Sequence, residues 1–402
     1  MTFKQISIRL HKWLGLFSGG VVCVICLTGA LYAFKEEIEA VSEPWRFVSA
    51  APHSPTHPGL GPASHSVLPP SEIFKRIEPL PQGWRPYALT YGEATDAIRV
   101  DLTAPEGKQG IVWIDPYEGT VLKWLGKEAR DFDFFRFVLD GHRRLWLPPA
   151  IGKPLVGSCV LIFLVVLLSG CVIWWPKVWT RERLRRFFRI KCDGGMRRLL
   201  FDVHVVVGLY AVVVLAGLAA TGLVWSFDWY SRGVYRLTGG KELKAYKLPV
   251  SDTTAVERPD ARVAAFPLDK LYHRLREEEP EAKGFYFVMP QRPEDVCRVS
   301  IVHKRNSYYQ TDNRFFDRYS LEELSGEGPY AGRYRTASLP DRLRRMNLEL
   351  HDGRIAGWPG KLVVCLAALA GASLPVSGYW IWWKKRGGKR KRPATRNGEK
   401  NK

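Results

Sequence analysis

Four histidines occupy matched places in two separate parts of the 402-residue chain. His11 lies 17 residues before the Thr28-Gly29 step, and His204 lies 17 residues before the Thr221-Gly222 step. The flanking sequences are also alike, HKWLGL and HVVVGL at the start and TGALY and TGLVW at the end. Imidazole is a common metal ligand and titrates near neutral pH, so histidines repeated at one spacing are candidates for chemistry.

The other two histidines, His142 and His351, precede a second matched pair of segments. One of these reads SGCVIWWPK from Ser169, and the other reads SGYWIWWKK from Ser377. Each segment lies 16 residues after the lysine of a Gly-Lys pair, and the histidines lie 11 and 10 residues before that lysine. The Gly-Lys pairs are Gly152-Lys153 and Gly360-Lys361.

The elements around these histidines are four apolar stretches without Asp, Glu, Lys or Arg. Each exceeds the roughly 20 residues that an α-helix needs to cross a bilayer. An apolar region of this length is too long for a signal peptide, and tryptophans at two of the ends suit the membrane interface. The sequence therefore predicts transmembrane helices over Trp13–Phe34, Leu155–Trp175, Val203–Phe227 and Leu362–Trp383.

Nearly all of the net charge of +20 lies in three short segments. Residues 1–12, 176–198 and 384–402 carry +3, +7 and +9 respectively. By the positive-inside rule, both termini and the middle loop are expected in the cytoplasm. A basic chain can also bind nucleic acid. Membrane topology, with contact to anionic lipid, accounts for this charge, so no nucleic-acid partner is expected.

The chain therefore predicts a membrane α-helical fold, a four-helix bundle built from a tandem duplication of a helix–ectodomain–helix unit. Helices that run in the same direction in both copies imply a pseudo-twofold axis along the membrane normal. The expected order is residues 1–34 (cytoplasmic N-terminus and helix 1), 35–150 (first ectodomain), 151–176 (helix 2), 177–199 (basic loop), 200–227 (helix 3), 228–358 (second ectodomain), 359–383 (helix 4) and 384–402 (basic tail).

Both ectodomains contain strand-like runs, and each is expected to form a small α+β unit with its own antiparallel sheet. Residues 87–92, 97–102 and 110–125 alternate polar and apolar side chains, as do 284–290, 296–303 and 307–320 in the second ectodomain. Asp115 to Gly119 reads as a hairpin turn, because Pro presets one φ and Gly supplies a positive one. A Pro/His/Ser-rich stretch at 52–66 reads as a linker, and His273 and His303 read as surface residues.

Placed on parallel duplicated helices, His11 and His204 fall at the cytoplasmic edge, while His142 and His351 fall at the opposite face. Each pair can sandwich a haem iron, with the second imidazole nitrogen of each ring hydrogen-bonded to the protein. A bis-imidazole iron has no open axial position, which favours electron transfer. Interfacial histidines that only hydrogen-bond a neighbouring helix remain the structural alternative, although polar residues in membrane segments are functional candidates.

Arginines near the histidines are candidates for binding the haem propionates by charge-assisted hydrogen bonds. Arginines are also expected at membrane interfaces in any case. Similarly, glycines in helices 1 and 3 fit either close approach of a flat macrocycle or tight helix packing. The arginines are Arg9, Arg143, Arg144 and Arg354, and the glycines are Gly15, Gly29, Gly208 and Gly222.

The segment GIVWIDPYEGTVL, followed by a membrane helix, resembles a PepSY domain with its transmembrane helix. The HKWLGL and SGxxIWW segments are similar to those of PepSY-associated membrane proteins, a family that includes iron-regulated membrane proteins and the siderophore reductase of the ferrioxamine type. The resemblance covers most of the chain. It implies two PepSY-like ectodomains, two b-type haems held by His11, His142, His204 and His351, and reduction of ferric siderophores outside the cytoplasm.

From these residues we expect a multi-pass protein of the plasma (inner) membrane with periplasmic or extracellular ectodomains. The short cytoplasmic segments cannot house a nicotinamide or flavin domain, so electrons are expected from a membrane quinol or a separate donor protein. Two alternatives stay open: a non-enzymatic PepSY accessory or anchor protein, and a transporter in iron uptake. Against a transporter, no acidic residue lies inside a predicted span.

Overall fold

A computed structural model describes residues 1–48, 67–77, 83–127, 132–176, 178–181, 189–190, 195–254 and 267–389. The chain divides into two compact units. A helical unit comprises Met1–Lys35, Asp133–Ser231 and Leu350–Lys402, and a sheet unit comprises Glu36–Phe132 and Arg232–Glu349. The linker expected at 52–66 lies outside the described residues, as does most of the basic tail.

Four long helices form the helical unit, and each is long and apolar enough to cross a membrane. They are α1 (Phe3–Tyr32), α5 (Pro149–Trp174), α7 (Gly195–Ser226) and α11 (Gly357–Lys389). These helices confirm the four spans expected from the sequence. They begin or end outside the charge-free stretches because helices continue through interfacial polar residues.

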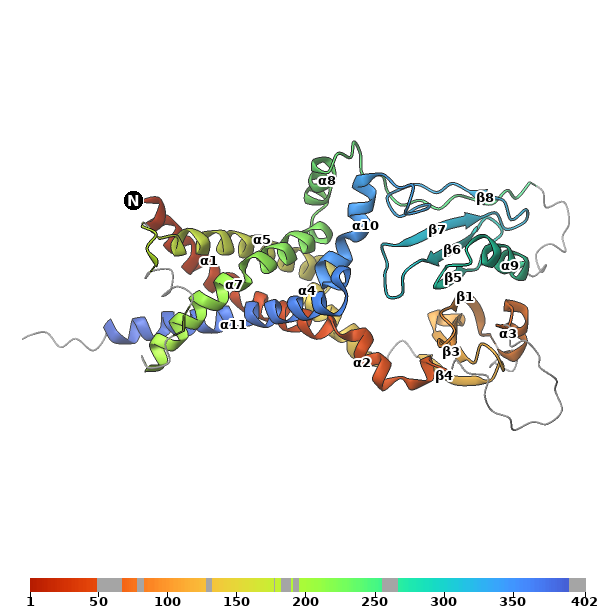
Figure 1. Ribbon diagram of the computed structural model, residues 1–402, viewed down its shortest axis with the longest axis horizontal. Coiled ribbons are helices and arrows are strands. Elements are labelled where there is room, and N and C mark those ends of the chain that lie inside the picture. The colour runs from red at the N-terminus through yellow and green to blue at the C-terminus, as the bar shows by residue number, and fades with distance from the viewer. Residues whose placement is uncertain are drawn as a thin grey trace, which may run out of the picture. The chain divides into compact units, whose positions relative to one another are not determined.

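The four helices pack as a bundle in which α1 and α7 each contact both α5 and α11 (Figure 1). The middle of the bundle is filled by small and aliphatic side chains, with one phenylalanine from α5 in the cluster. Because lipid tails are as apolar as these side chains, close packing rather than hydrophobic burial holds the helices together. The buried cluster is Val22, Phe163, Leu167, Ala211, Leu215 and Ala219.

Two shorter helices, α4 (Phe134–Arg144) and α10 (Leu339–Asp352), precede α5 and α11 respectively. Asp133 caps the start of α4, because its carboxylate accepts from the Arg136 N–H at 3.0 Å, and the helix packs on α1 and α5. The second segment of the helical unit also begins at Asp133, so that α4 belongs to this unit. Hydropathy overlooks α4 because this helix is amphipathic.

Tight reversals join these short helices to the spans that follow. Helix α4 ends with Leu145 in the left-handed region at φ 53°, and the Trp146 N–H bonds the Asp140 carbonyl at 3.3 Å. The Leu145 N–H bonds the Gly141 carbonyl at 3.0 Å, the single hydrogen bond of a left-handed helix cap, a position that usually takes glycine. After α10 the left-handed residue is Gly353, at φ 81°, followed by a 3-10 turn over Arg354–Ala356.

The reversals explain the glycine of each Gly-Lys pair. A Cβ on Gly152 would lie 2.2 Å from the Arg144 carbonyl oxygen, and one on Gly360 would lie 2.1 Å from the Gly353 carbonyl oxygen. Both contacts are with backbone, which cannot move aside as a flexible side chain would. Glycine therefore lets the start of each membrane span pass directly under the end of the short helix before it.

We expect Gly152→Ala to lower the free energy of unfolding by about 1–3 kcal/mol, the usual cost of overpacking. Thermal unfolding of the detergent-purified chain measures the change. Gly217→Ala on α7 is the matched control, because nothing lies within 4 Å of a Cβ placed there. Equal melting temperatures for the two variants would contradict a close backbone contact between Gly152 and the Arg144 carbonyl.

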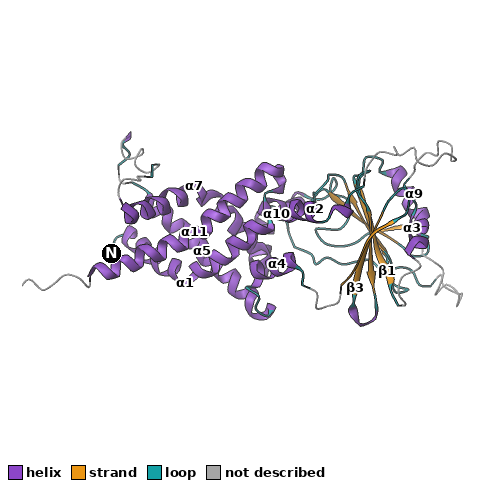
Figure 2. Cartoon of the chain, turned by 90° about the horizontal axis from the view of Figure 1, so that it is seen from below, coloured by secondary structure: helices purple, strands orange, loops and turns teal. Residues whose placement is uncertain are grey.

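The sheet unit contains one eight-stranded antiparallel sheet in the order β4-β3-β2-β1-β5-β6-β7-β8 (Figure 2). Two small separate sheets were expected, but β1 pairs with β5, from Ala88 opposite Val288 to Tyr91 opposite Phe285. Pairing removes two exposed sheet edges. The strands are β1 (Arg85–Tyr91), β2 (Ile98–Thr103), β3 (Gln109–Ile114), β4 (Val121–Lys127), β5 (Gly284–Val288), β6 (Cys297–Val302), β7 (Thr311–Phe316) and β8 (Glu323–Leu324).

Helices α3 (Pro70–Ile77) and α9 (Leu268–Glu278) pack side by side and supply apolar side chains to the same core as the strands. The Ser71 N–H donates to the Asp269 carboxylate at 2.8 Å and joins their first turns. The remaining elements are α2 (Lys35–Ser42), η1 (Pro44–Arg46), η2 (Pro105–Gly107) and α8 (Asp228–Leu237).

The β3–β4 hairpin confirms the turn predicted at Asp115 to Gly119. The Asp115 carboxylate accepts from the N–H groups of Tyr117 and Glu118 at 2.8 and 2.9 Å. Gly119 adopts φ 72°, the left-handed conformation that glycine takes at low cost.

Candidate functional site

His11 and His204 face one another inside the bundle and form what we term the first histidine pair. His11 lies on α1 and His204 on α7, and their ring centroids are 6.2 Å apart at an interplanar angle of 85°. Two helices far apart in sequence thus present the two imidazoles to each other at one level.

His142 on α4 and His351 on α10 form the second histidine pair, with ring centroids 6.1 Å apart. His142 contacts α1 near Gly29, 18 residues beyond His11, which corresponds to about 27 Å along a helix. The two pairs therefore lie near opposite ends of α1. The indole of Trp225 lies 5.4 Å from the His351 ring.

Each imidazole is anchored through Nδ1 to the neighbouring membrane helix. The Nδ1 atoms of His11 and His142 lie 3.0 and 2.8 Å from the carbonyl oxygens of Val166 and Ile25. Those of His204 and His351 lie 2.9 Å from the hydroxyl oxygens of Ser377 and Thr221. The Leu374 and Leu218 carbonyls lie within hydrogen-bonding reach of the same two rings.

The direction of these bonds sets the tautomer. Ser169 donates its hydroxyl proton to the Val166 carbonyl at 2.8 Å, and Thr221 donates to the Gly217 carbonyl at 2.7 Å. Ser377 likewise donates to carbonyls of its own helix at 3.0 Å. Since the hydroxyl protons are used, Nδ1 of each histidine is the donor. Nε2 is then left with its lone pair available to a metal.

A glycine next to each hydroxyl residue makes room for the imidazole. A Cβ on Gly29 or Gly222 would lie 3.0 or 3.2 Å from Cε1 of His142 or His351. At the first pair the distance from Gly170 to His11 is 3.2 Å, whereas the 3.5 Å from Gly378 to His204 is ordinary van der Waals contact. Each Ser-Gly or Thr-Gly step therefore lies against one imidazole, and at three of the four the contact is close enough to favour glycine.

The repeated Ser-Gly and Thr-Gly dipeptides are visible in the sequence, but their contact with the histidine rings is not. Gly170 and Gly378 were not among the candidate site residues, although each belongs to a repeated SGxxIWW segment. Gly15 and Gly208, by contrast, face Val166 and Leu374 at 3.8 and 3.5 Å, which is ordinary helix packing. Repetition of the Ser-Gly step was the signal that could have identified its role.

Burial lowers the pKa of His142 and of His351, the latter to about 3. The positive charge of Arg143 also disfavours protonation of His142, and coupling to His142 does the same for His351. Both imidazoles of the second pair are therefore neutral at physiological pH, which is the form that binds metals.

The spacing of the pairs fits a metal ion between the rings. A nitrogen–metal distance of about 2 Å, with about 1 Å from nitrogen to ring centre, gives about 6 Å between centroids. No cluster of three or more His, Cys, Asp or Glu occurs in the described part of the chain. Two imidazoles alone suit an ion that brings its own equatorial ligands, as iron does in a porphyrin.

The four arginines considered as propionate partners differ in their surroundings. Arg9 and Arg143 are exposed. Arg144 pairs with Asp140 through hydrogen bonds of 3.0 and 2.5 Å, and Arg354 pairs with Asp352 at 2.8 Å. Arg144 and Arg354 are thus already engaged by carboxylates of their own segments.

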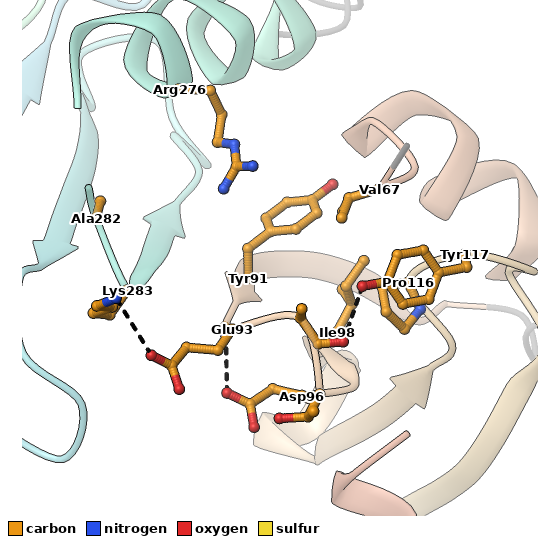
Figure 3. Close-up of a pocket in the computed structure, with 13 residues that line it drawn as sticks. Val67, Tyr91, Glu93, Asp96, Ile98, Pro116, Tyr117, Arg276, Ala282 and Lys283 are labelled. Carbon is orange, nitrogen blue, oxygen red and sulfur yellow. Dashed lines mark hydrogen bonds and ion pairs between the residues drawn. The ribbon is translucent and has the colours of Figure 1, made fainter. Parts of the chain in front are cut away.

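The sheet unit holds a pocket of about 460 Å³ beside the junction of β1 and β5 (Figure 3). Tyr91 and Ile98 are among its apolar lining residues, and Glu93 and Asp96 provide carboxylates. Arg305 bonds both carboxylates at 2.8 Å. Arg276 and Lys283 also line the pocket, so that it offers a polar binding space with charges of both signs.

His303, expected at the surface, is instead held in the sheet. Its Nε2 lies 2.9 Å from the carboxylate of buried Asp312, which also accepts from the Tyr334 N–H at 2.7 Å. Asp312 lies nine residues further along, on the facing strand β7, so the contact follows only from the pairing of β6 with β7.

Comparison with curated proteins found none that matches the chain. The model of the family described as PepSY-associated TM region matches residues 8–385, which covers nearly the whole chain and includes all four histidines. This chain therefore belongs to the PepSY-associated TM region family of membrane proteins.

Proposed function

We propose that this protein carries electrons across the plasma (inner) membrane through two b-type haems and reduces ferric siderophores on the outer side, releasing Fe(II). The observation that carries the proposal is the pair of facing imidazoles at each end of the bundle, 6.2 and 6.1 Å apart. Spacing, tautomer and neutral charge all suit axial ligation.

His11 with His204, and His142 with His351, would hold the two haems, which supply a one-electron iron couple when bound. The chain's own part is to fix each Nε2 in place through its Nδ1 hydrogen bond, so that little rearrangement accompanies a change of charge. Two imidazoles on one iron would favour electron transfer over oxygen chemistry.

The aliphatic cluster between the two pairs keeps water out of the path and separates the two levels. Val22 and Leu215 in this cluster are 1% exposed. In a medium without water, a change of charge on one site is stabilised only by fixed groups of the protein, here the carbonyl and hydroxyl dipoles around each imidazole.

The proposed orientation rests on charge. Basic residues at both termini and between α5 and α7 favour a cytoplasmic position for the first pair. The second pair would then lie near the outer face of the membrane. We also infer that the halves arose by tandem duplication, because histidine, hydroxyl residue and glycine recur in the same arrangement at all four places.

Reduction explains how iron would be released. Ferric iron is a hard cation that oxygen chelators bind tightly, and ferrous iron binds them more weakly. One electron passed to the chelated Fe(III) gives Fe(II), which can dissociate. The electron would come from a membrane quinol or from a separate donor protein.

The test is a reduced-minus-oxidised visible spectrum of the detergent-purified chain with a haem-to-protein ratio. We expect a low-spin b-type signal and two haems per chain. The reduced protein should then be reoxidised by a ferric trihydroxamate siderophore, but not by its Ga(III) complex, because gallium has no accessible divalent state. A colourless protein from haem-replete cells would contradict the proposal and favour an accessory or transport role.

A further inference from the structure

The pocket beside the junction of β1 and β5 is built from both segments of the sheet unit (Figure 3). Its apolar and aromatic side chains, among them Tyr91, Ile98 and Tyr117, come from the first segment. Arg276 of α9 and Lys283, which directly precedes β5, line it from the second segment. The volume of about 460 Å³ lies within the range of roughly 300–1,000 Å³ that is usual for small-molecule sites.

The two carboxylates of the pocket are held in place by hydrogen bonds within the sheet unit. The Asp96 carboxylate accepts from the Glu93 N–H at 2.9 Å. Arg305 donates to the carboxylates of both residues at 2.8 Å. Because these groups are already ordered, a ligand that enters beside them loses little binding energy to their reorganisation.

Arg276 is a lining cation without a carboxylate partner. Among the described residues its guanidinium forms no hydrogen bond and no ion pair. Arg274, two residues earlier on α9, is by contrast paired with Glu278 at 2.7 Å. Figure 3 shows Arg276 extending from α9 towards Tyr91. The side chain is exposed, so a ligand can reach it from solvent.

The described charges around the pocket leave one positive charge in excess. Arg305 bonds both Glu93 and Asp96, and Lys283 lies 3.9 Å from the Glu93 carboxylate, so these four charges cancel. Arg276 adds a further cation. A monoanion balances this site, whereas a dianion such as phosphate leaves a negative charge beside two carboxylates.

We propose that the pocket binds a small monocarboxylate with an apolar body. The Arg276 guanidinium donates two parallel N–H bonds to the ligand, because its planar fork matches the two oxygens of a carboxylate. The body of the ligand packs against Val67, Ile98 and Tyr117, where loss of apolar surface from water adds affinity. This site lies in the sheet unit alone and goes beyond the proposed function, since it requires no haem.

Calorimetric titration of the full chain in phosphatidylcholine nanodiscs tests the proposal, with titrations of empty nanodiscs subtracted. The probes are phenylbutanoate, methylpentanoate and octanoate, each compared with its amide, which has nearly the same shape but no charge. We expect at least one acid to bind once per chain and about tenfold or more tighter than its amide, because hydrogen bonds to a charged group are the stronger ones. Binding of no acid, or equal affinity for acid and amide, would overturn the proposal.

Substitutions on α9 test the role of the guanidinium. Arg276→Met removes the cation and should lower the affinity for the acid to that for the amide, whereas Arg276→Lys should retain part of the preference. Lys270→Met is the matched control, because it removes a cation from an exposed position of the same helix that does not line the pocket. An equal loss in Arg276→Met and Lys270→Met would attribute binding to the general charge of α9 and reject the site.

A third substitution tests the cavity itself. Ala282 lines the pocket, and the indole of Ala282→Trp should occupy part of the space and weaken the acid by about tenfold while Arg276 is retained. Undiminished binding would show that the carboxylate binds on the surface of α9 and not in the pocket. Thermal unfolding without ligand checks that each variant is folded. None of these measurements depends on haem, so their failure leaves the proposed function standing.

Discussion

Replacing His351 by alanine is expected to reduce the haem content from two per chain to one and to abolish reoxidation by ferric siderophore. His142 would then face no second imidazole across the 6.1 Å that now separates the rings. Loss of an axial ligand should exceed the roughly 10–100-fold loss of affinity that removal of a hydrogen-bonding partner of a ligand causes. Haem content and the amplitude of the visible spectrum measure the effect.

His273→Ala is the matched control for this variant, because His273 is an exposed histidine on α9. His11→Ala should also lose one haem. The absorbance lost in His11→Ala should be the part of the low-spin signal that remains in His351→Ala. Two haems in His351→Ala, or loss of the same component in both variants, would refute the assignment of one haem to each histidine pair.

The second large effect is expected from a glycine that lies against a histidine ring. Gly222→Val places a branched side chain where a Cβ alone would lie 3.2 Å from Cε1 of His351. Overpacking of this kind costs about 1–3 kcal/mol, which corresponds to roughly tenfold to hundredfold weaker binding. The imidazole should shift and the second haem should be lost at low haem supply, as measured by the haem-to-protein ratio.

The same helix provides the control. Gly217 lies five residues earlier on α7 and has nothing within 4 Å of its Cβ position, so Gly217→Val should retain two haems. Gly29 and Gly20 form an equivalent comparison on α1. Equal haem content in Gly222→Val and Gly217→Val would show that the glycines beside the imidazoles do not position the histidines.

Much of this arrangement could be predicted because it depends on local sequence. Length and the lack of charge identify the four spans, and Asp115 to Gly119 specify a turn through their own backbone preferences. The four histidines were identified because repetition at one spacing does not require knowledge of the fold. Their approach across the bundle depends only on two helices that run in the same direction.

Other features depend on contacts that sequence order does not reveal. The pairing of β1 with β5 joins Ala88 to Val288, two hundred residues apart, and no local pattern distinguishes it from two separate sheets. Arg144 and Arg354 were selected for proximity in sequence to histidines, yet each is engaged by a nearby aspartate.

The junction between β1 and β5 also imposes an order on biosynthesis. β1 is complete at Tyr91, but its partner β5 begins only at Gly284, after two membrane spans have been made and inserted. At about 5–20 residues per second, β1 remains an unpaired edge for roughly 10–40 s. During this interval the nascent first half presents a template for intermolecular strand addition. Its solubility therefore depends on how quickly the ribosome and the insertion machinery deliver the second half.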